Sequence, residues 1–246
     1  MNNKKQLISI EGNIGAGKST FVNIIKNNVP NTEIVSEPIE IWKKTVDADN
    51  ENILDKFYKN IPRWAYTFQN FACITRMMKI EDTLRETTAE LVFLDRSLAT
   101  DKYIFEKMLH DGKQISELEH NIYNLWCDFY YKYVRPELEN ITIYLRCNPL
   151  TALERIKKRG RTEEQNISIS YLTDLHNYHE KWLMENNEKS KSNVIVINTD
   201  KDFENDEEYQ KEIINNILNE INLIRQKKLM NINENIYNHN NVNYVI

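Results

Sequence analysis

The chain has 246 residues, of which 41% are hydrophobic, so it can bury one sizeable core and is expected to form a single domain. Its net charge of −5 argues against a protein that coats nucleic acid, which would carry a basic stripe or tail. Three cysteines without metal-ligand spacing argue against a disulfide framework or zinc site, and a first apolar run too short for a signal peptide or membrane span predicts a cytoplasmic protein without membrane contact.

The first half of the chain alternates between short apolar runs and helical patterns. Residues 6–11 predict a buried strand, and the apolar residues of 18–28 recur at helical spacing, so a glycine-rich turn joins a strand to a helix. A second strand is expected at 32–36, because Glu37 and Pro38 follow it and proline ends strand pairing. The next predicted elements are a long helix at 64–88, a strand at 91–94 and a helix at about 98–109.

The second half continues this alternation, with one charged interruption. Its predicted elements are a helix at 115–134, a strand at 141–145, a helix from Pro149 to about 158, a helix at 170–185, a strand at 194–197 and a helix at 207–229. Dense charge and a glycine at 157–165 predict an exposed loop, and we expect a mobile lid at about 157–167. The asparagine-rich residues 230–246 are expected to form a disordered tail behind a domain at 1–229. Strands alternating with helices predict a parallel sheet with ligands above its carboxyl edge.

A phosphate-binding motif connects the first strand to the first helix. Residues 12–19 match G-x-x-x-x-G-K-[ST] after a strand and before a helix, which is the context that the motif requires. Backbone amides and the helix dipole hold phosphate charge there, Lys18 reaches the terminal phosphates and Ser19 can ligate Mg²⁺. The motif therefore predicts ATP and Mg²⁺ as cofactors, whereas a tight turn without a ligand would not need three of the chain's five glycines. The expected ATP contacts are Gly12, Asn13, Ile14, Gly15, Ala16, Gly17, Lys18, Ser19 and Thr20.

Two further segments end at the same edge of the predicted sheet. Glu37 follows the second strand, where a carboxylate can take the proton from an attacking hydroxyl. Asp95 and Arg96 close the third strand, where a carboxylate can hold Mg²⁺ and a guanidinium can steady a nucleophile and a γ-phosphate. The alternatives are a solvated loop glutamate and a plain surface ion pair.

A group of polar and aromatic residues on two predicted helices could recognise a nucleobase. The group comprises Phe68, Gln69, Ala72, Arg76, Asp101 and Phe105. Gln69, Ala72 and Arg76 share one helix face through their spacing, and Asp101 and Phe105 form an i, i+4 pair on another helix. Core packing around a buried arginine–aspartate pair explains the pattern equally well, so both interpretations stay open.

Three arginines surround the charged loop after the helix that Pro149 opens. Arg155 and Arg159 are one helical turn apart, and Arg161 follows the glycine of the loop. Such a group suits a lid that closes over phosphates. The alternative is a solvated basic helix end.

These motifs together resemble the deoxynucleoside kinases, the family that includes deoxycytidine and deoxyguanosine kinases. The resemblance runs from about residue 6 to about residue 223. It is carried by the segments IEGNIGAGKST, SEPIEIW, RWAYTFQNFACITR, LDRSLATDKYIFEKML, RGRTEEQNISISYLTDLHNYHEKWL and DKDF. The resemblance implies a P-loop kinase fold with a five-stranded parallel sheet flanked by helices and a charged lid loop. It also implies a homodimer built on two long helices and transfer of the γ-phosphate of ATP to the 5′-hydroxyl of a deoxynucleoside in nucleotide salvage.

The resemblance also implies roles for individual residues. It makes Glu37 the general base with Arg96 as its partner at the 5′-hydroxyl, places Ser19 and Asp95 at Mg²⁺, and makes Lys18 a catalytic phosphate contact. At the substrate it implies Gln69, Arg76 and Asp101 at the base, Phe68 and Phe105 as aromatic walls, Tyr58 and Glu164 at the 3′-hydroxyl, and Trp42 and Tyr171 lining the pocket. At the phosphate donor it implies Arg155, Arg159 and Arg161 in the lid, and Asp202 and Phe203 beside the donor base. The family usually has glutamate where this chain has Asp95, which is one methylene shorter.

The trio Ala72, Arg76 and Asp101 predicts a preference among deoxynucleosides. An ionised Asp101 only accepts hydrogen bonds, so it suits the amino group of cytosine or adenine and repels thymine O4, while Arg76 could donate to guanine. We therefore expect deoxycytidine or purine deoxynucleosides to be favoured over thymidine. The rival hypotheses are a thymidylate-type nucleoside monophosphate kinase and a non-catalytic structural subunit of the same fold.

Overall fold

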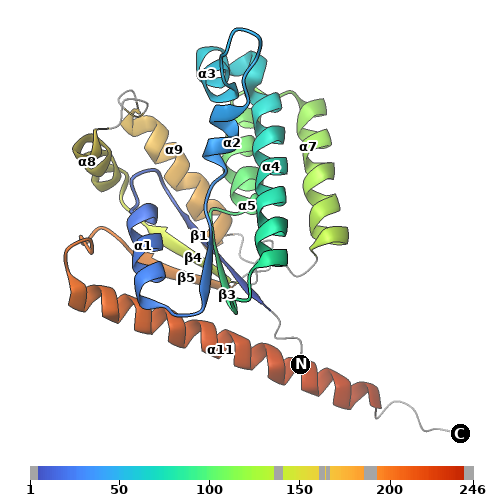
Figure 1. Ribbon diagram of the computed structural model, residues 1–246, viewed down its shortest axis with the longest axis vertical. Coiled ribbons are helices and arrows are strands. Elements are labelled where there is room, and N and C mark those ends of the chain that lie inside the picture. Colours follow the sequence, from blue (N-terminus) through green and yellow to red (C-terminus); the bar gives the residue numbers. More distant parts are fainter. Residues whose placement is uncertain (1–4, 136–140, 161–163, 165–166, 186–192, 241–246) are drawn as a thin grey trace, which may run out of the picture. The chain divides into compact units, whose positions relative to one another are not determined.

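The computed structural model describes residues 5–135, 141–160, 164, 167–185 and 193–240, with the backbone alone for 228, 229 and 231–240 (Figure 1). Its contacts divide the chain into two compact units, Met1–Lys201 and Asp202–Ile246, and each is described by itself. The expected domain at 1–229 with a tail at 230–246 stays a prediction.

The first unit contains a five-stranded sheet in which all neighbouring strands are parallel, in the order β2-β3-β1-β4-β5. The strands are β1 (Gln6–Gly12), β2 (Thr32–Val35), β3 (Leu91–Asp95), β4 (Ile141–Arg146) and β5 (Asn193–Asn198). Helices flank the sheet, and the central strands are largely buried, as their mainly apolar sequences predict (Figure 1). The predicted α/β fold with a five-stranded parallel sheet is confirmed. Because the strands are parallel, the carboxyl ends of β1, β2 and β3 meet at one edge.

The helices of the first unit follow the predicted order. Those that are α-helical throughout are α1 (Lys18–Asn28), α2 (Ile39–Lys44), α3 (Ile53–Lys59), α4 (Ile61–Glu86) and α8 (Pro149–Arg159). The helix predicted at 98–109 consists of α5 (Leu98–Thr100), the π-helical η1 (Asp101–Glu106) and α6 (Lys107–Asp111). The remaining two are α7 (Glu117–Phe129) continued by η2 (Tyr130–Val134), and α9 (Ile169–His179) continued by η4 (Glu180–Glu185).

The helices α2 and α3 and the first turn of α4 were not predicted. Asn52 caps α3 by accepting a hydrogen bond from the Asp55 amide, and Asn60 caps α4 by accepting one from the Arg63 amide. Pro62 stands in the first turn of α4, where its missing N–H needs no partner. The α2 and α3 helices are short, so their stability comes from tertiary packing, which hydrophobic periodicity does not reveal.

Two clusters of buried side chains hold the first unit together. One joins the sheet to α4 and α7 through Val35, Val92, Leu94, Cys73, Ile80, Leu84, Tyr123 and Cys127. The other packs α2, α3 and α4 together through Trp42, Ile53, Phe57, Ala65, Phe68 and Ala72. The second cluster contains three residues expected in the substrate pocket, so those residues sit on a packed wall of the protein.

The second unit is dominated by α11 (Glu207–Asn240), which continues past the expected end at 229. No glycine or proline occurs between 207 and 240, so nothing in the sequence stops the helix. Asp202 accepts a hydrogen bond from the Glu204 amide, and the Gln210 side chain donates to the Phe203 carbonyl, which orders the segment before α11. Among the described residues, no helix combines the length and hydropathy needed to cross a bilayer.

Candidate active site

The glycine-rich turn lies between the end of β1 and the start of α1. A Cβ on Gly12 would lie 2.7 Å from the Leu145 carbonyl oxygen, and one on Gly15 would lie 2.4 Å from that of Ala152. No side chain fits there, so both positions require glycine if the turn is to keep this shape. Gly17, with φ of 93°, starts α1, whose N-terminal amides are therefore directed into the turn.

Two side chains close the turn from within. Lys18 donates from Nζ to the carbonyl oxygens of Gly12 and Asn13, at 2.9 Å each. Burial, with Arg96 nearby, lowers the pKa of Lys18 to about 7. The Asn13 side chain is buried, donating to the Leu172 carbonyl and accepting from the Ile14 amide at 2.8 Å each. Asn13 therefore shapes the turn and has only its backbone to offer a phosphate.

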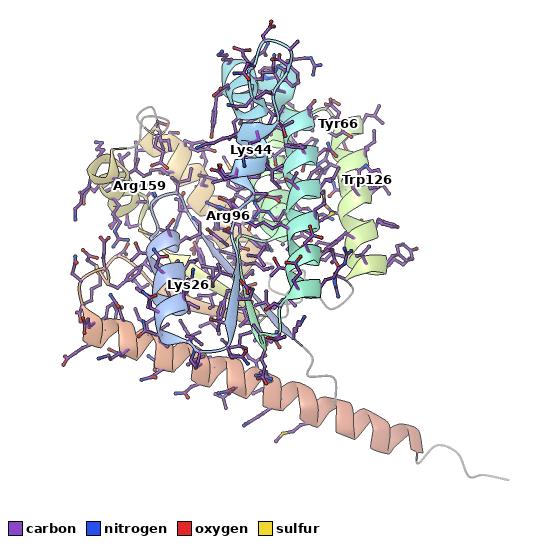
Figure 2. The ribbon with its side chains drawn as sticks, in the orientation of Figure 1. Lys26, Lys44, Tyr66, Arg96, Trp126 and Arg159 are labelled. Atoms are coloured by element: carbon purple, nitrogen blue, oxygen red, sulfur yellow. The ribbon has the colours of Figure 1, made fainter. Side chains whose placement is uncertain are left out.

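The turn after β3 holds Arg96 in an unusual backbone conformation. Arg96 has φ of 68°, a left-handed value that is costly for a residue with a side chain. Its amide donates to the Ile10 carbonyl at 3.1 Å, which ties the turn to β1. Its side chain is seen between α1 and α4 in Figure 2, with the guanidinium 5.0 Å from the centre of the Phe105 ring. Strain of this kind is concentrated at functional sites.

Glu11 on β1 also supports the turn after β3, and it was not among the residues predicted from the sequence. Its side chain is fully buried and accepts hydrogen bonds from the Ser97 amide at 3.0 Å and from the Thr100 hydroxyl. Burial raises the pKa of Glu11, while Ser97 and Thr100 act against that rise. The only signal in the sequence was a carboxylate placed in an otherwise apolar buried strand, which requires partners.

Glu37 lies beside two arginines at the end of β2. Its Oε1 is 3.1 Å from Arg76 Nη2 and 3.4 Å from Arg96 Nε. Burial acts to raise the pKa of Glu37, but Arg96 and Arg76 outweigh it and the net pKa is lowered. The carboxylate is therefore ionised at neutral pH and can accept a proton.

Asp95 is a half-buried carboxylate with one buried oxygen atom, Oδ1. Its Oδ1 has no hydrogen-bond partner among the described residues. Burial raises the pKa of Asp95, and Lys18 opposes that rise. Such an atom fits a cation, and Ser19 is exposed at the start of α1. The described residues contain no cluster of three or more His, Cys, Asp or Glu side chains that could hold a metal, and the expected Mg²⁺ contacts of Asp95 and Ser19 stay a prediction.

The residues expected at the base lie on α4 and at the start of η1, where the two helices contact each other. Arg76 donates to Asp101 twice, from Nε at 2.8 Å and from Nη2 at 3.2 Å, and both side chains are buried. Burial raises the pKa of Asp101, whereas Arg76 acts to lower it. Gln69 and Ala72 are also buried on this face of α4. Both the predicted grouping and the alternative of a buried arginine–aspartate pair describe what the structure contains.

The aromatic residues expected around the substrate form a connected group. The ring centres of Trp42 and Phe68 are 5.3 Å apart in an edge-to-face arrangement, and Trp42 Nε1 donates to the Thr75 hydroxyl at 2.9 Å. Tyr58 on α3 is 68% exposed. Burial, with Tyr58 nearby, raises the pKa of Tyr171 to about 12. Tyr58 on α3 and Tyr171 on α9 therefore lie near each other.

The arginines expected in the lid are held by the protein itself. Arg155 donates from Nη1 to Cys147 Sγ at 3.7 Å and from Nη2 to the Lys201 carbonyl at 3.5 Å. Arg159 donates to Glu164 from Nε at 3.1 Å and from Nη2 at 2.6 Å, so one lid arginine is paired with the carboxylate expected at the 3′-hydroxyl. Arg161 lies outside the described residues. Asp202 and Phe203 begin the second unit, so their expected place beside the donor base stays a prediction.

Comparison with known proteins identifies the family of the chain. A family model for deoxynucleoside kinases matches residues 8–222. The probable deoxycytidine kinase of fowlpox virus (strain NVSL) is 44% identical over 211 residues, 85% of this chain and 86% of that protein. Human deoxycytidine kinase is 35% identical over 219 residues (80% and 84%), and the mitochondrial deoxyguanosine kinase of Xenopus laevis is 31% identical over 232 residues (85% and 87%). The chain therefore belongs to the deoxynucleoside kinase family, a family of phosphotransferases.

Proposed function

We propose that this kinase transfers the γ-phosphate of ATP to the 5′-hydroxyl of a deoxynucleoside, with deoxycytidine or purine deoxynucleosides favoured over thymidine. The observation that carries the proposal is an ionised Glu37 between Arg76 and Arg96, at the sheet edge that also bears the phosphate-binding turn. A general base and a phosphate site at one edge suit phosphoryl transfer to a hydroxyl.

In the proposed mechanism the protein acts mainly by positioning. The amides of residues 12–20 and Lys18 hold the phosphates of ATP, and Arg155, Arg159 and Arg161 cover them. Bound Mg²⁺, held by Asp95 and Ser19, would neutralise charge on the terminal phosphates. Glu37 accepts the proton of the 5′-hydroxyl, while Arg96 orients that hydroxyl for in-line attack.

The proposed base preference rests on Asp101 and the pocket around it. Asp101 is paired with a guanidinium, so it is an acceptor that suits an exocyclic amino group, and thymine offers none. Ala72 keeps the pocket wall small, and Gln69 supplies both a donor and an acceptor. The named activities of the relatives, deoxycytidine and deoxyguanosine kinase, support the same class of substrate and a role in nucleotide salvage.

The decisive test is a panel of acceptors incubated with ATP and Mg²⁺. Deoxycytidine, deoxyadenosine and deoxyguanosine should be phosphorylated faster than thymidine, and nucleoside monophosphates should be ignored. A 5′-phosphate on the acceptor would be placed against the Glu37 carboxylate, which repels it. If thymidine monophosphate or cytidine monophosphate were the best acceptor, the enzyme would instead be a monophosphate kinase.

We also propose that the protein forms a homodimer through α4 and α7. Both helices leave large apolar side chains exposed: Leu118, Leu125, Trp126 and Phe129 on α7, and Ile74 and Met78 on α4. Figure 2 labels Trp126 among them. A patch of this kind on neighbouring helices is typical of an obligate interface. Sedimentation velocity should give a dimer mass for the wild type, and Leu125→Glu with Trp126→Glu should shift it to a monomer. A monomeric wild type would contradict this assembly.

A further inference from the structure

Arg76 uses all its hydrogen-bonding capacity within the protein. A guanidinium has five N–H groups and no acceptor. Nε and one N–H of Nη2 bind the two oxygens of Asp101, at 2.8 and 3.2 Å, and Nη2 also donates to Glu37 Oε1 at 3.1 Å. Nη1 donates to the carbonyl oxygens of Asp95 at 3.1 Å and Arg96 at 3.4 Å. Every N–H group of this side chain therefore has a partner.

This arrangement leaves Arg76 no hydrogen bond to give a nucleobase. Only 2% of Arg76 is exposed, so water cannot replace a partner that it loses. A base that accepted from Arg76 would have to displace a carboxylate or a backbone carbonyl, and would leave that buried acceptor unpaired at a cost in free energy. Contact with the base therefore falls to Gln69 and Asp101.

The partners of Arg76 are groups whose positions matter for the proposed chemical step. One is Glu37, the proposed general base, and two are the carbonyls before and after the left-handed Cα of Arg96. Backbone strain of this kind is unfavourable and persists only where the surroundings enforce it. Arg76 helps to hold the strained turn in place through its two carbonyl partners. The same planar guanidinium also fixes the direction of the Glu37 carboxylate.

We infer that Arg76 is a positioning residue that orients Glu37 and the Arg96 turn for the chemical step and does not itself touch the base. The inference rests on the proposed function, because it assigns Glu37 the proton. It has a consequence that base recognition would not have. Loss of Arg76 should slow the chemical step equally for every accepted base, because the 5′-hydroxyl is the same in all of them.

The first experiment compares Arg76→Lys, Arg76→Met and the control Arg63→Met on deoxycytidine, deoxyadenosine and deoxyguanosine. Arg63 is an exposed cation in the first turn of the same helix. Lysine keeps the buried charge, so that variant should fold, but its N–H groups radiate from one atom and cannot span the partners of Arg76. Both Arg76 variants should lose about tenfold to hundredfold in kcat for each substrate, with KM within about threefold, and the control should match the wild type.

The second experiment asks whether Arg76 acts through Glu37. Arg76→Lys is measured alone and in a Glu37→Gln background, with melting temperature and ATP binding recorded for each protein. If the two residues act as a unit, the Arg76→Lys effect on kcat should shrink to less than about threefold in that background. Additive effects would overturn the inference, as would an unchanged kcat with a higher KM for one base only.

The two proposals fail in different ways. A wild type that phosphorylates no deoxynucleoside contradicts the proposed function and the inference with it. A wild type that is active, with an Arg76→Lys variant that folds, keeps its kcat and changes only its choice of base, contradicts the inference alone.

Discussion

The acceptor side of the site and the donor side are built differently. On the acceptor side, Gln69, Arg76 and Asp101 are buried, and the arginine and aspartate have fixed partners. On the donor side, Arg159 lies at the exposed end of α8 and is paired with Glu164 (Figure 2). A buried polar network is rigid, whereas an exposed ion pair is worth little and exchanges partners readily. On the proposed function, the difference predicts that the acceptor side is formed before the substrate arrives and that Arg159 exchanges Glu164 for phosphate when ATP binds.

The largest expected effect comes from breaking the acceptor side at Glu37. Glu37→Ala should lower kcat by about 10²- to 10⁴-fold, because the 5′-hydroxyl loses its general base. ATP binding should be retained, whereas Lys18→Ala should lose it. Glu40→Ala, an exposed glutamate on α2, is the control and should behave as wild type. A near-normal kcat for Glu37→Ala would contradict the assignment of the general base.

The next effect tests what the acceptor side selects. Replacing both members of the buried pair, Arg76→Met with Asp101→Ala, should raise the ratio of kcat/KM for thymidine to that for deoxycytidine by about tenfold to hundredfold. The reason is that the carboxylate which repels thymine O4 is gone. Steady-state kinetics on both substrates measures the ratio. A wild type that already prefers thymidine would contradict the base assignment and leave the kinase activity standing.

A third prediction concerns the dependence of folding stability on pH, which we expect to come from His179, a buried side chain at the end of α9. Burial lowers the pKa of His179 to about 3, below the ordinary value of 6.5. Between pH 6.5 and pH 3, His179 is therefore protonated in the unfolded chain and neutral in the folded protein. Its contribution to the free energy of unfolding is fully present above pH 6.5 and is lost as the pH falls toward 3. The loss between pH 8 and pH 5 should be about 2 kcal/mol.

Urea unfolding at the two pH values measures this loss. His179→Phe keeps a flat ring against Tyr144, whose ring centre is 5.8 Å from that of His179, and should remove the loss. His176→Gln, on the same helix but only partly buried, should keep it. An unchanged slope in His179→Phe would show that another group causes the acid sensitivity.

The smallest effect is expected on the donor side. Arg159→Ala should raise KM for ATP by about threefold to tenfold, because the phosphate contact that it removes first has to displace Glu164. The melting temperature should be unchanged. Lys157→Ala, an exposed cation on the same helix, is the matched control. If Arg159→Ala cost as much as Glu37→Ala, the lid would be as pre-formed as the acceptor pocket.

The sheet and the glycine-rich turn were predictable because their signals are local. Apolar runs set the strands, and the spacing of Gly12, Gly15 and Gly17 set the turn. The edge position of Glu37 and Asp95 then followed from parallel topology alone.

The remaining features depend on contacts between distant segments. The α2 and α3 helices are stabilised by packing against α4, and the role of Glu11 is visible only when the turn after β3 lies above it. The sequence could pair Arg76 with Asp101, but the further bond to Glu37 required the real direction of a guanidinium. Likewise, the pairing of Arg159 with Glu164 joins two predicted roles that the sequence treated separately.

The left-handed backbone of Arg96 joins a strained conformation to a residue with a proposed role in the reaction. A glycine at φ of 68° would carry no strain, so Arg96→Gly would relax the backbone of the turn while removing a guanidinium from the reaction centre. The proposed function assigns that guanidinium to the reacting hydroxyl, so we expect Arg96→Gly to lose turnover. On the proposed function, relaxation of the backbone and turnover oppose each other at the turn after β3, where the buried Arg96 side chain also packs on Phe105 and pairs with Glu37, so stabilising substitutions are better sought elsewhere in the chain.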